Sequence, residues 1–215
     1  DIHLPGFPQA GDDEVAFVCY AAGVAAGMSY GVAGSSAALW LPVGDHAEHA
    51  YETHFRYSDD CEFTLRDIDR MTIEIQYLRP FEMSGESEQV TGHAWIVFGY
   101  NAGTDPDRQF RVNFGWSGSE DGWYSCDNML DYTLVQAHLT RIAPDYMRFV
   151  GTGAGGGNDG TPSDPFSSIV AAASAAPANA TLILQAEWNE SIGTPLVMSR
   201  PMTLRSYHAV VGSVP

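Results

Sequence analysis

Hydrophobic positions in the first part of the chain recur with a helical period in two stretches. Between Asp13 and Met28, apolar or small residues occupy one helical face and most of the opposite face, which predicts a helix buried on nearly every side. Asp12 or Asp13 can cap the start of this helix. Between Asp67 and Leu78 the pattern fits either a helix or a strand, and we favour a helix ended by Pro80.

From residue 92 onward the hydrophobic pattern becomes that of β-strands. Residues 94–100 form a continuous apolar and aromatic run, and residues 110–114 alternate between apolar and polar side chains. Turn-forming residues fill the segment 101–107 between these runs, so we expect an antiparallel hairpin. A third short strand is predicted at residues 122–126.

The pattern near the end of the chain predicts a short helix followed by regularly spaced strands. Apolar residues on one face of 168–176 indicate the helix, and a turn is expected at residues 189–191. Strand-like segments at 182–184 and 202–204 recur after 20 residues, near the length of one coil of a β-solenoid. The segment of about 160–215 resembles the capping helix and first rungs of right-handed parallel β-helix proteins, the group that includes the pectate lyases.

Charge divides the chain near residue 150. Residues 1–150 contain 23 acidic residues and 8 arginines, the remainder contains 4 and 2, and six of the residues 151–160 are glycine. We therefore predict a first domain at 1–150, a glycine-rich linker at 151–160 and a second domain at 161–215. The net charge of −17 disfavours nucleic acid and anionic membranes as partners, and no apolar run is long enough to span a membrane.

One pair of residues in the predicted hairpin suggests catalytic chemistry. His93 and Asn113 are equidistant from Gly103, the centre of the turn region. Residues equidistant from an antiparallel turn face one another, with Cβ atoms about 4.5–5.5 Å apart, unless a bulge or longer loop shifts the register. An amide beside the histidine would fix the imidazole tautomer, so that the other ring nitrogen can face a thiol. Trp116 is expected close by, where it would shield the pair.

Three motifs lie in this region: Gly-His-Ala-Trp at 92–95, Phe-Arg-Val-Asn-Phe-Gly-Trp-Ser-Gly at 110–118 and Asp-Gly-Trp-Tyr at 121–124. Together they resemble the motifs of the streptopain-like cysteine peptidases, bacterial enzymes of papain fold that are usually secreted with a propeptide. The resemblance extends over about residues 13–150. It implies that His93 is the catalytic histidine, that Asn113 orients it and that Trp116 matches a tryptophan of the family's Asn-Trp-Gly-Trp-Gly run, from which Phe114 and Ser117 depart.

Two further groups of polar residues lie upstream of these motifs. Residues 24–37 are similar to the family's segment between its core helix and its substrate-binding turn, which implies that three small residues line the substrate cleft: Gly34, Ser35 and Ser36. His46 and His49 lie among acidic residues and could suggest a metal site. A solvated acidic face is the simpler interpretation, so we expect neither a metal nor a cofactor.

None of the three cysteines has the setting of the family's nucleophile, which precedes the core-helix segment at the start of its own helix. Cys19 lies within the apolar helix and is expected to be core packing, where a thiol is inert. Acidic neighbours of Cys61 disfavour its thiolate, and Cys126 ends a strand, where a structural role is simpler. Since the chain begins at Asp1 without an initiator methionine, we expect an excised piece of a longer polypeptide whose other part carries the nucleophile.

These observations predict an α+β protein: a papain-like cysteine peptidase domain with an antiparallel sheet and a buried core helix, followed by the first rungs of a β-helix. The expected function is part of a secreted or cell-surface cysteine endopeptidase, which hydrolyses polypeptide substrates through a Cys-His dyad and an orienting Asn. A companion chain could carry the catalytic cysteine. The alternative is a catalytically inactive homologue that acts as an extracellular binding or surface-display module; of the two, we favour the enzyme.

Overall fold

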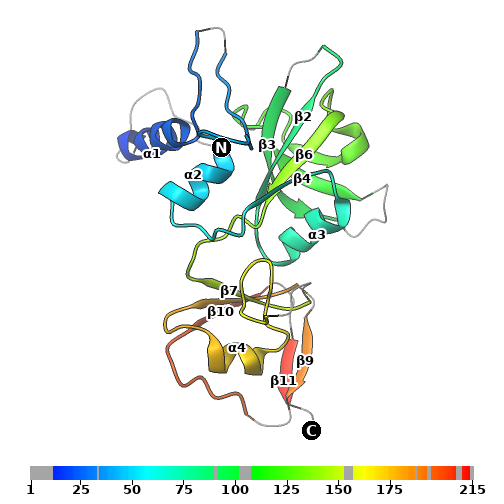
Figure 1. The fold of residues 1–215 in the computed structure, drawn as a ribbon. Helices are drawn as coiled ribbons and strands as arrows, with labels where there is room; N and C mark the ends of the chain where they lie inside the picture. The colour runs from blue at the N-terminus through cyan, green and yellow to red at the C-terminus, as the bar shows by residue number, and fades with distance from the viewer. Residues whose placement is uncertain are drawn as a thin grey trace. The chain divides into compact units, whose positions relative to one another are not determined.

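The computed structural model divides the chain into two compact units (Figure 1). The first unit contains residues 1–56, 61–67 and 81–140, and the second unit contains residues 57–60, 68–80 and 141–215. Each unit therefore draws on segments that are distant in the sequence. The residues that the structure describes are 12–32, 34–89, 92–101, 108–152, 157–186, 188–192, 195–206 and 210–213.

A six-stranded antiparallel sheet forms the centre of the first unit. Its strand order is β1-β6-β2-β3-β4-β5, so β6 returns to lie between β1 and β2. The expectation of an α+β protein with an antiparallel sheet is confirmed. The strands are β1 (Glu62–Leu65), β2 (Phe81–Glu86), β3 (Gly92–Tyr100), β4 (Gln109–Asn113), β5 (Gly122–Ser125) and β6 (Leu134–Thr140), with a short 3-10 helix η1 (Cys126–Asn128) after β5.

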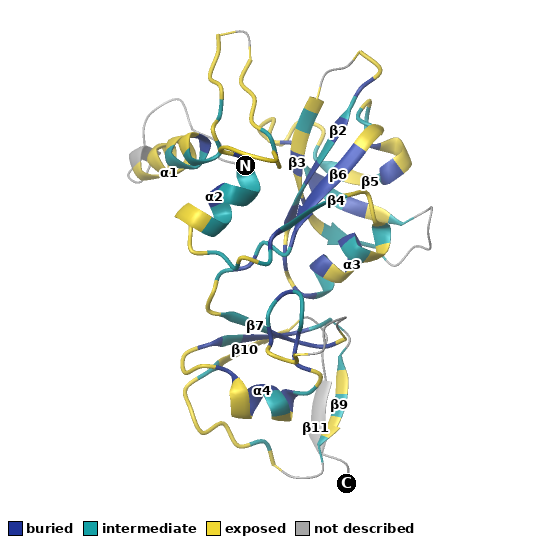
Figure 2. Ribbon diagram, in the orientation of Figure 1, coloured by how far each residue is buried: buried dark blue, intermediate teal, exposed yellow. Residues whose placement is uncertain are grey.

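Alternation along the strands builds the core of the first unit. Residues on β2 alternate between buried and half-buried positions, and β3 and β4 each bury every second residue in their central parts. This period of two places one row of side chains on the same face of the sheet. The buried strand segments are dark blue in Figure 2. Their largest fully buried side chains include Phe81, Met83, Phe110 and Leu139.

The register between β3 and β4 differs from the one that the hairpin symmetry predicted. Asn113 pairs with Ile96 rather than with His93. The pairs beside the turn, Tyr100 with Phe110 and Gly99 with Arg111, are equidistant from position 105 instead of 103, and an irregularity between Val97 and Gly99 then shifts the register by one position. His93 instead pairs with Gly85 on β2. The predicted midpoint, Gly103, lies outside the described residues, as does the rest of the turn at 102–107. The prediction of a direct cross-strand pair between His93 and Asn113 is therefore wrong.

Two helices of the first unit, α1 (Asp12–Ala25) and α2 (Ala47–His54), follow each other before the first strand. The expectation that α1 is a buried core helix is wrong, because most of its apolar side chains are exposed (yellow in Figure 2). Tyr20 stacks on Tyr30, and Gly23 approaches the same tyrosine, so neighbouring chain covers only part of the helix. A helix that is apolar on all sides needs cover on all sides.

The second unit combines two helices with parallel strands. The ambiguous segment near residue 70 is helix α3 (Ile68–Gln76), as predicted, and the predicted helix near the end of the chain is α4 (Ile169–Ala175). β8 (Thr181–Leu184) pairs in parallel with β7 (Met147–Val150) and with β10 (Thr203–Ser206). β9 (Asn189–Ile192) pairs in parallel with β11 (Val210–Ser213), so the turn predicted at 189–191 is wrong.

A buried ion pair stabilises the end of α3 within the second unit. Arg79 donates two hydrogen bonds to the Glu74 carboxylate, at 2.8 and 2.6 Å, and a third to the Pro162 carbonyl. The guanidinium lies 4.9 Å from the ring centre of Tyr77 and 4.5 Å from that of Phe149. Both charged side chains are almost completely buried, and the charges and donors of the pair are well matched.

Candidate active site

His93 lies at the start of β3, half-buried, with one ring nitrogen already engaged. Its Nε2 lies 2.9 Å from the carbonyl oxygen of Phe114. Since a carbonyl can only accept, Nε2 carries the proton of the neutral imidazole, and Nδ1 keeps its lone pair. The backbone of Phe114 therefore fixes the tautomer that the sequence analysis expected an asparagine amide to fix.

The turn after β4 holds this carbonyl in place. Oδ1 of Asn113 accepts a hydrogen bond from the Gly115 backbone N–H at 2.7 Å, and Gly115 adopts a positive φ of 77°. The backbone N–H of Phe114 donates to Oδ1 of Asp121 at 3.0 Å. Asn113 thus contacts the turn that presents Phe114 to the histidine. Asp121 has a comparable role that the sequence analysis did not predict.

Aromatic rings surround the imidazole on several sides. Trp116 stacks on His93 with a distance of 4.6 Å between ring centres, in agreement with the expected proximity. Tyr132, Phe114 and Trp95 follow at 5.4, 6.1 and 6.3 Å. Trp116 itself is partly exposed, whereas Trp95 and Phe114 are buried. The sequence analysis did not find Tyr132, because its position depends on the long-range pairing of β6 with β2.

The residues predicted to line a cleft lie in a separate exposed hairpin of the first unit. Ser29 and Ser36 form an antiparallel bridge with backbone hydrogen bonds of 2.8 and 3.1 Å. Gly34, Ser35 and Ser36 are all exposed on this hairpin. Their hydrogen bonds and contacts in the described part of the chain do not join them to His93. Their assignment to a cleft stays a prediction.

The three cysteines differ in exposure. Cys19 is exposed on α1, so the expectation that it packs in the core is wrong. The exposed surface of α1 described above is the physical reason. Cys61 and Cys126 are buried, which agrees with the structural role expected for Cys126. A buried thiol meets neither solvent nor substrate.

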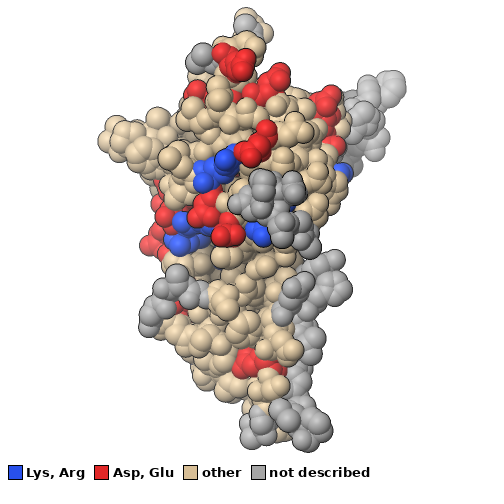
Figure 3. Space-filling model, turned by 90° about the vertical axis from the view of Figure 1, so that its right-hand side faces the viewer, with Lys and Arg blue, Asp and Glu red and all other residues tan. Residues whose placement is uncertain are grey.

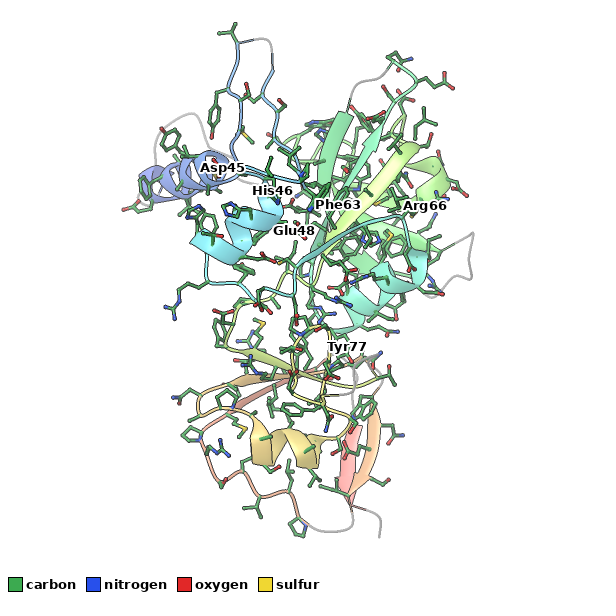
Figure 4. All side chains as sticks on the ribbon, viewed as in Figure 1. Asp45, His46, Glu48, Phe63, Arg66 and Tyr77 are labelled. Atoms are coloured by element: carbon green, nitrogen blue, oxygen red, sulfur yellow. The ribbon has the colours of Figure 1, made fainter. Side chains whose placement is uncertain are left out.

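Three histidine rings lie in sequence at α2, with 5.8 Å between the centres of His46 and His49 and 5.9 Å between those of His49 and His54. Figure 4 labels His46 with the acidic residues Asp45 and Glu48. His46 is buried, which contradicts its placement on a solvated face: its Nδ1 contacts the Gly44 carbonyl at 2.8 Å, and its Nε2 lies 3.6 Å from Glu48. Glu48 also accepts the Phe63 backbone N–H at 3.3 Å. Within the described residues, no group of three or more histidine, cysteine or acidic side chains is arranged to hold a metal ion.

Two further features concern the charge on one face of the molecule and the length of the described helices. On the face drawn in Figure 3, arginines are interspersed with acidic side chains instead of forming one continuous basic area. Among the helices described, none has the length and the apolar character needed to cross a membrane.

One of three comparisons with known proteins, a family profile, covers the motifs around His93. A search of curated proteins gave no match. Among solved structures, the chain is similar to the active wild-type interpain A cysteine protease of Prevotella intermedia, with 27% identity and a TM-score of 0.48. The similarity covers 63% of this chain and 58% of that enzyme's chain, so the present chain spans less than two thirds of it. A profile of the peptidase C10 family matches residues 5–124. Since this match covers more than half of its length, the chain belongs to the peptidase C10 family.

Proposed function

We propose that this chain is the histidine-bearing part of a cysteine endopeptidase whose nucleophile lies in a segment outside these 215 residues. The observation that carries the proposal is the engaged Nε2 of His93, which leaves Nδ1 as a proton acceptor in a site walled by aromatic rings. Membership of the peptidase C10 family supports the choice of a thiol as its partner. The substrates are polypeptides, and we propose a secreted or cell-surface location and a papain-like fold.

The proposed reaction assigns two proton transfers to His93. Nδ1 of His93 takes the proton of the cysteine thiol, and the thiolate attacks the peptide carbonyl carbon. The imidazolium then gives its proton to the leaving amine, and an acyl-enzyme remains. Water, deprotonated by the same imidazole, hydrolyses the thioester and regenerates the thiol. Asn113 orients the imidazole through the turn that presents the Phe114 carbonyl.

Thiol alkylation tests this proposal on the native protein together with any companion chain. The protein is treated with an iodoacetamide or epoxide probe, and the adduct is mapped by mass spectrometry, with His93→Ala as the matched variant. We expect one fast, pH-dependent adduct outside residues 1–215, lost in the variant because the thiolate loses its base. An adduct on Cys19 that also depends on His93 would move the nucleophile into this chain and overturn the proposal. Slow labelling of Cys19 in both proteins reflects only its exposure.

The second candidate function is a catalytically inactive homologue that acts as an extracellular binding or surface-display module. The observation that favours it is that the contacts of His93 in the described residues are to rings and a carbonyl, while Cys61 and Cys126 are buried. The same alkylation experiment separates the two candidates. Thiols that react only after unfolding, with none activated in the native protein, would favour the binding module.

We further propose that the second domain, residues 161–215, is the cap and first rungs of a β-helix after a linker at 151–160. Parallel pairing of Thr203 with Thr181 and of Val210 with Asn189, which are 22 and 21 residues apart, supports a coil slightly longer than the 20 residues of the sequence pattern. Residues 153–156 of the linker lie outside the described residues. In hydrogen exchange, we expect the amides of β8 and β10 to lose protection together. Independent exchange of the two strands would count against a stacked coil.

A further inference from the structure

The ring of Tyr132 occupies a side of the imidazole that Trp116 does not cover. The ring centre of His93 lies 4.6 Å from that of Trp116 and 5.4 Å from that of Tyr132. The centres of Trp116 and Tyr132 are 6.4 Å apart, so these two rings lie beside different parts of the histidine. Tyr132 also lies 6.0 Å from the buried ring of Trp95. The tyrosine is half-buried and comes from the segment between η1 and β6, far along the chain from β3.

The backbone at Tyr132 is held by a buried glutamine. Nε2 of Gln136 donates to the carbonyl oxygens of Cys126 and Tyr132, at 2.7 and 2.9 Å. Oε1 of Gln136 accepts from Arg66 at 3.2 Å, which uses the remaining polar atom of the amide. The backbone N–H of Tyr132 donates to the Met129 carbonyl at 3.0 Å. The backbone N–H and carbonyl of Tyr132 are therefore both hydrogen-bonded, which fixes the point from which its ring extends to the histidine.

Gly85 allows this backbone to pass close to the strand beside His93. A Cβ at Gly85 would lie 2.6 Å from the Tyr132 carbonyl oxygen and 3.0 Å from the Trp95 ring. Gly85 is also the residue that pairs with His93 across β2 and β3. The register of β2 against β6 shifts between Ser84 and Glu86, at this same position. Glycine and the irregular register together place Tyr132 against the histidine site.

We propose that Tyr132 is a positioning residue of the His93 site, whose ring, together with Trp116, confines the imidazole to the orientation that bonds the Phe114 carbonyl. The torsion that turns an imidazole is broad and roughly two-fold, so a single hydrogen bond leaves the ring free to flip unless neighbouring rings prevent it. The catalytic purpose of this confinement rests on the function proposed above. The confinement itself is a property of the chain and can be measured without turnover.

The test follows the His93 ring by NMR in the full, isotope-labelled chain. The Hε1 resonance is assigned by its loss in His93→Gln, and the reaction of His93 with diethyl pyrocarbonate is timed by mass spectrometry. We expect Tyr132→Leu to shift the Hε1 resonance and to speed the modification several-fold. We expect Tyr132→Phe to restore both values, because the ring and not the hydroxyl makes the contact. Tyr20→Leu, which removes an exposed ring on α1, should change neither value.

Two results would overturn the proposal. One is a folded Tyr132→Leu protein, judged by circular dichroism, in which resonance and modification rate equal those of the unsubstituted chain. The other is the absence of a nuclear Overhauser effect between the Tyr132 and His93 ring protons in the unsubstituted chain, which does not depend on any variant folding. Neither readout requires a nucleophile, so a failed alkylation experiment would remove the peptidase function and leave Tyr132 as a measured wall of the histidine.

Discussion

The His93 site and the Glu74–Arg79 pair both place an ionisable side chain among aromatic rings, but they leave it in opposite states. Arg79 uses its donors on Glu74 and Pro162, lies against two rings and is 3% exposed. His93 is half-buried and has one nitrogen bonded to a carbonyl. A side chain whose polar atoms are all satisfied in the interior stabilises the fold, whereas one with an unused lone pair at a partly open site can exchange protons.

Breaking the buried ion pair of Glu74 and Arg79 should have the largest effect on stability. Arg79→Met leaves the Glu74 carboxylate buried without its charged partner, so we expect a loss of about 3–5 kcal/mol in the free energy of unfolding. Urea unfolding followed by circular dichroism measures this loss. Asp127→Asn is the control, because it removes the exposed ion pair of Arg66 and Asp127, for which we expect about 1 kcal/mol or less. Equal losses in the two variants would contradict the comparison.

Disturbing the backbone of β2 beside the His93 site should have a smaller effect on stability. Gly85→Ala places a Cβ against the Tyr132 carbonyl and the Trp95 ring, so the backbone must shift, and we expect a loss of about 1–3 kcal/mol. Thermal or urea unfolding measures it. In Gly92→Ala, the control on the neighbouring strand, the new Cβ has its nearest contact at 4.0 Å, so its stability should stay close to that of the unsubstituted chain. An unchanged free energy of unfolding in Gly85→Ala would show that the backbone of Tyr132 does not pack closely against Gly85.

The smallest effect on stability is expected at Glu82, a carboxyl that accepts a hydrogen bond from Tyr51. Burial raises the pKa of the Glu82 carboxyl from its ordinary value of 4.5, and the 2.6 Å hydrogen bond from Tyr51 opposes this rise only in part. The folded protein therefore binds this proton more tightly than the unfolded chain, so the group's contribution to stability falls as the pH rises from 4.5 through the raised pKa.

Glu82→Gln removes this titration and keeps an acceptor for Tyr51. We expect the variant to lose less stability than the unsubstituted chain as the pH rises above 4.5. Urea unfolding at a series of pH values measures the difference, and Glu86→Gln on the same strand is the control. Parallel pH profiles for Glu82→Gln and the unsubstituted chain would show that the buried carboxyl does not couple to folding.

Local patterns predicted the elements around the site, but not the contacts between distant segments. Alternation and composition located β3, β4 and β5 to within a few residues, and the motif around His93 located Trp116. The partner of Asn113 was wrong because the pairs beside the turn, Tyr100 with Phe110 and Gly99 with Arg111, are equidistant from position 105 and not from position 103. The irregularity between Val97 and Gly99 changes the register of the later pairs by only one position. The burial of α1 was wrong for a related reason: its own sequence says that it needs cover, not where the cover lies.

Tyr132 marks the limit of prediction from sequence most clearly. Its ring reaches His93 only because β6 crosses back to pair with β2, where Gly85 lets the backbone pass. Nothing within a few residues of Tyr132 indicates that pairing. Glu74 and Arg79 are only five positions apart, so their contact is local. Their burial, however, depends on a distant strand, β7, which carries Phe149.

The separation in sequence of the contacting residues also sets an order in time. Glu74 and Arg79 are five residues apart, so their contact closes a short loop and can form while the rest of the chain is still unfolded. The contact of Tyr132 with His93 spans 39 positions and needs β2, β3 and β6 in register first. Because such non-local pairings form slowly, we expect the histidine to acquire its final surroundings among the last events of folding.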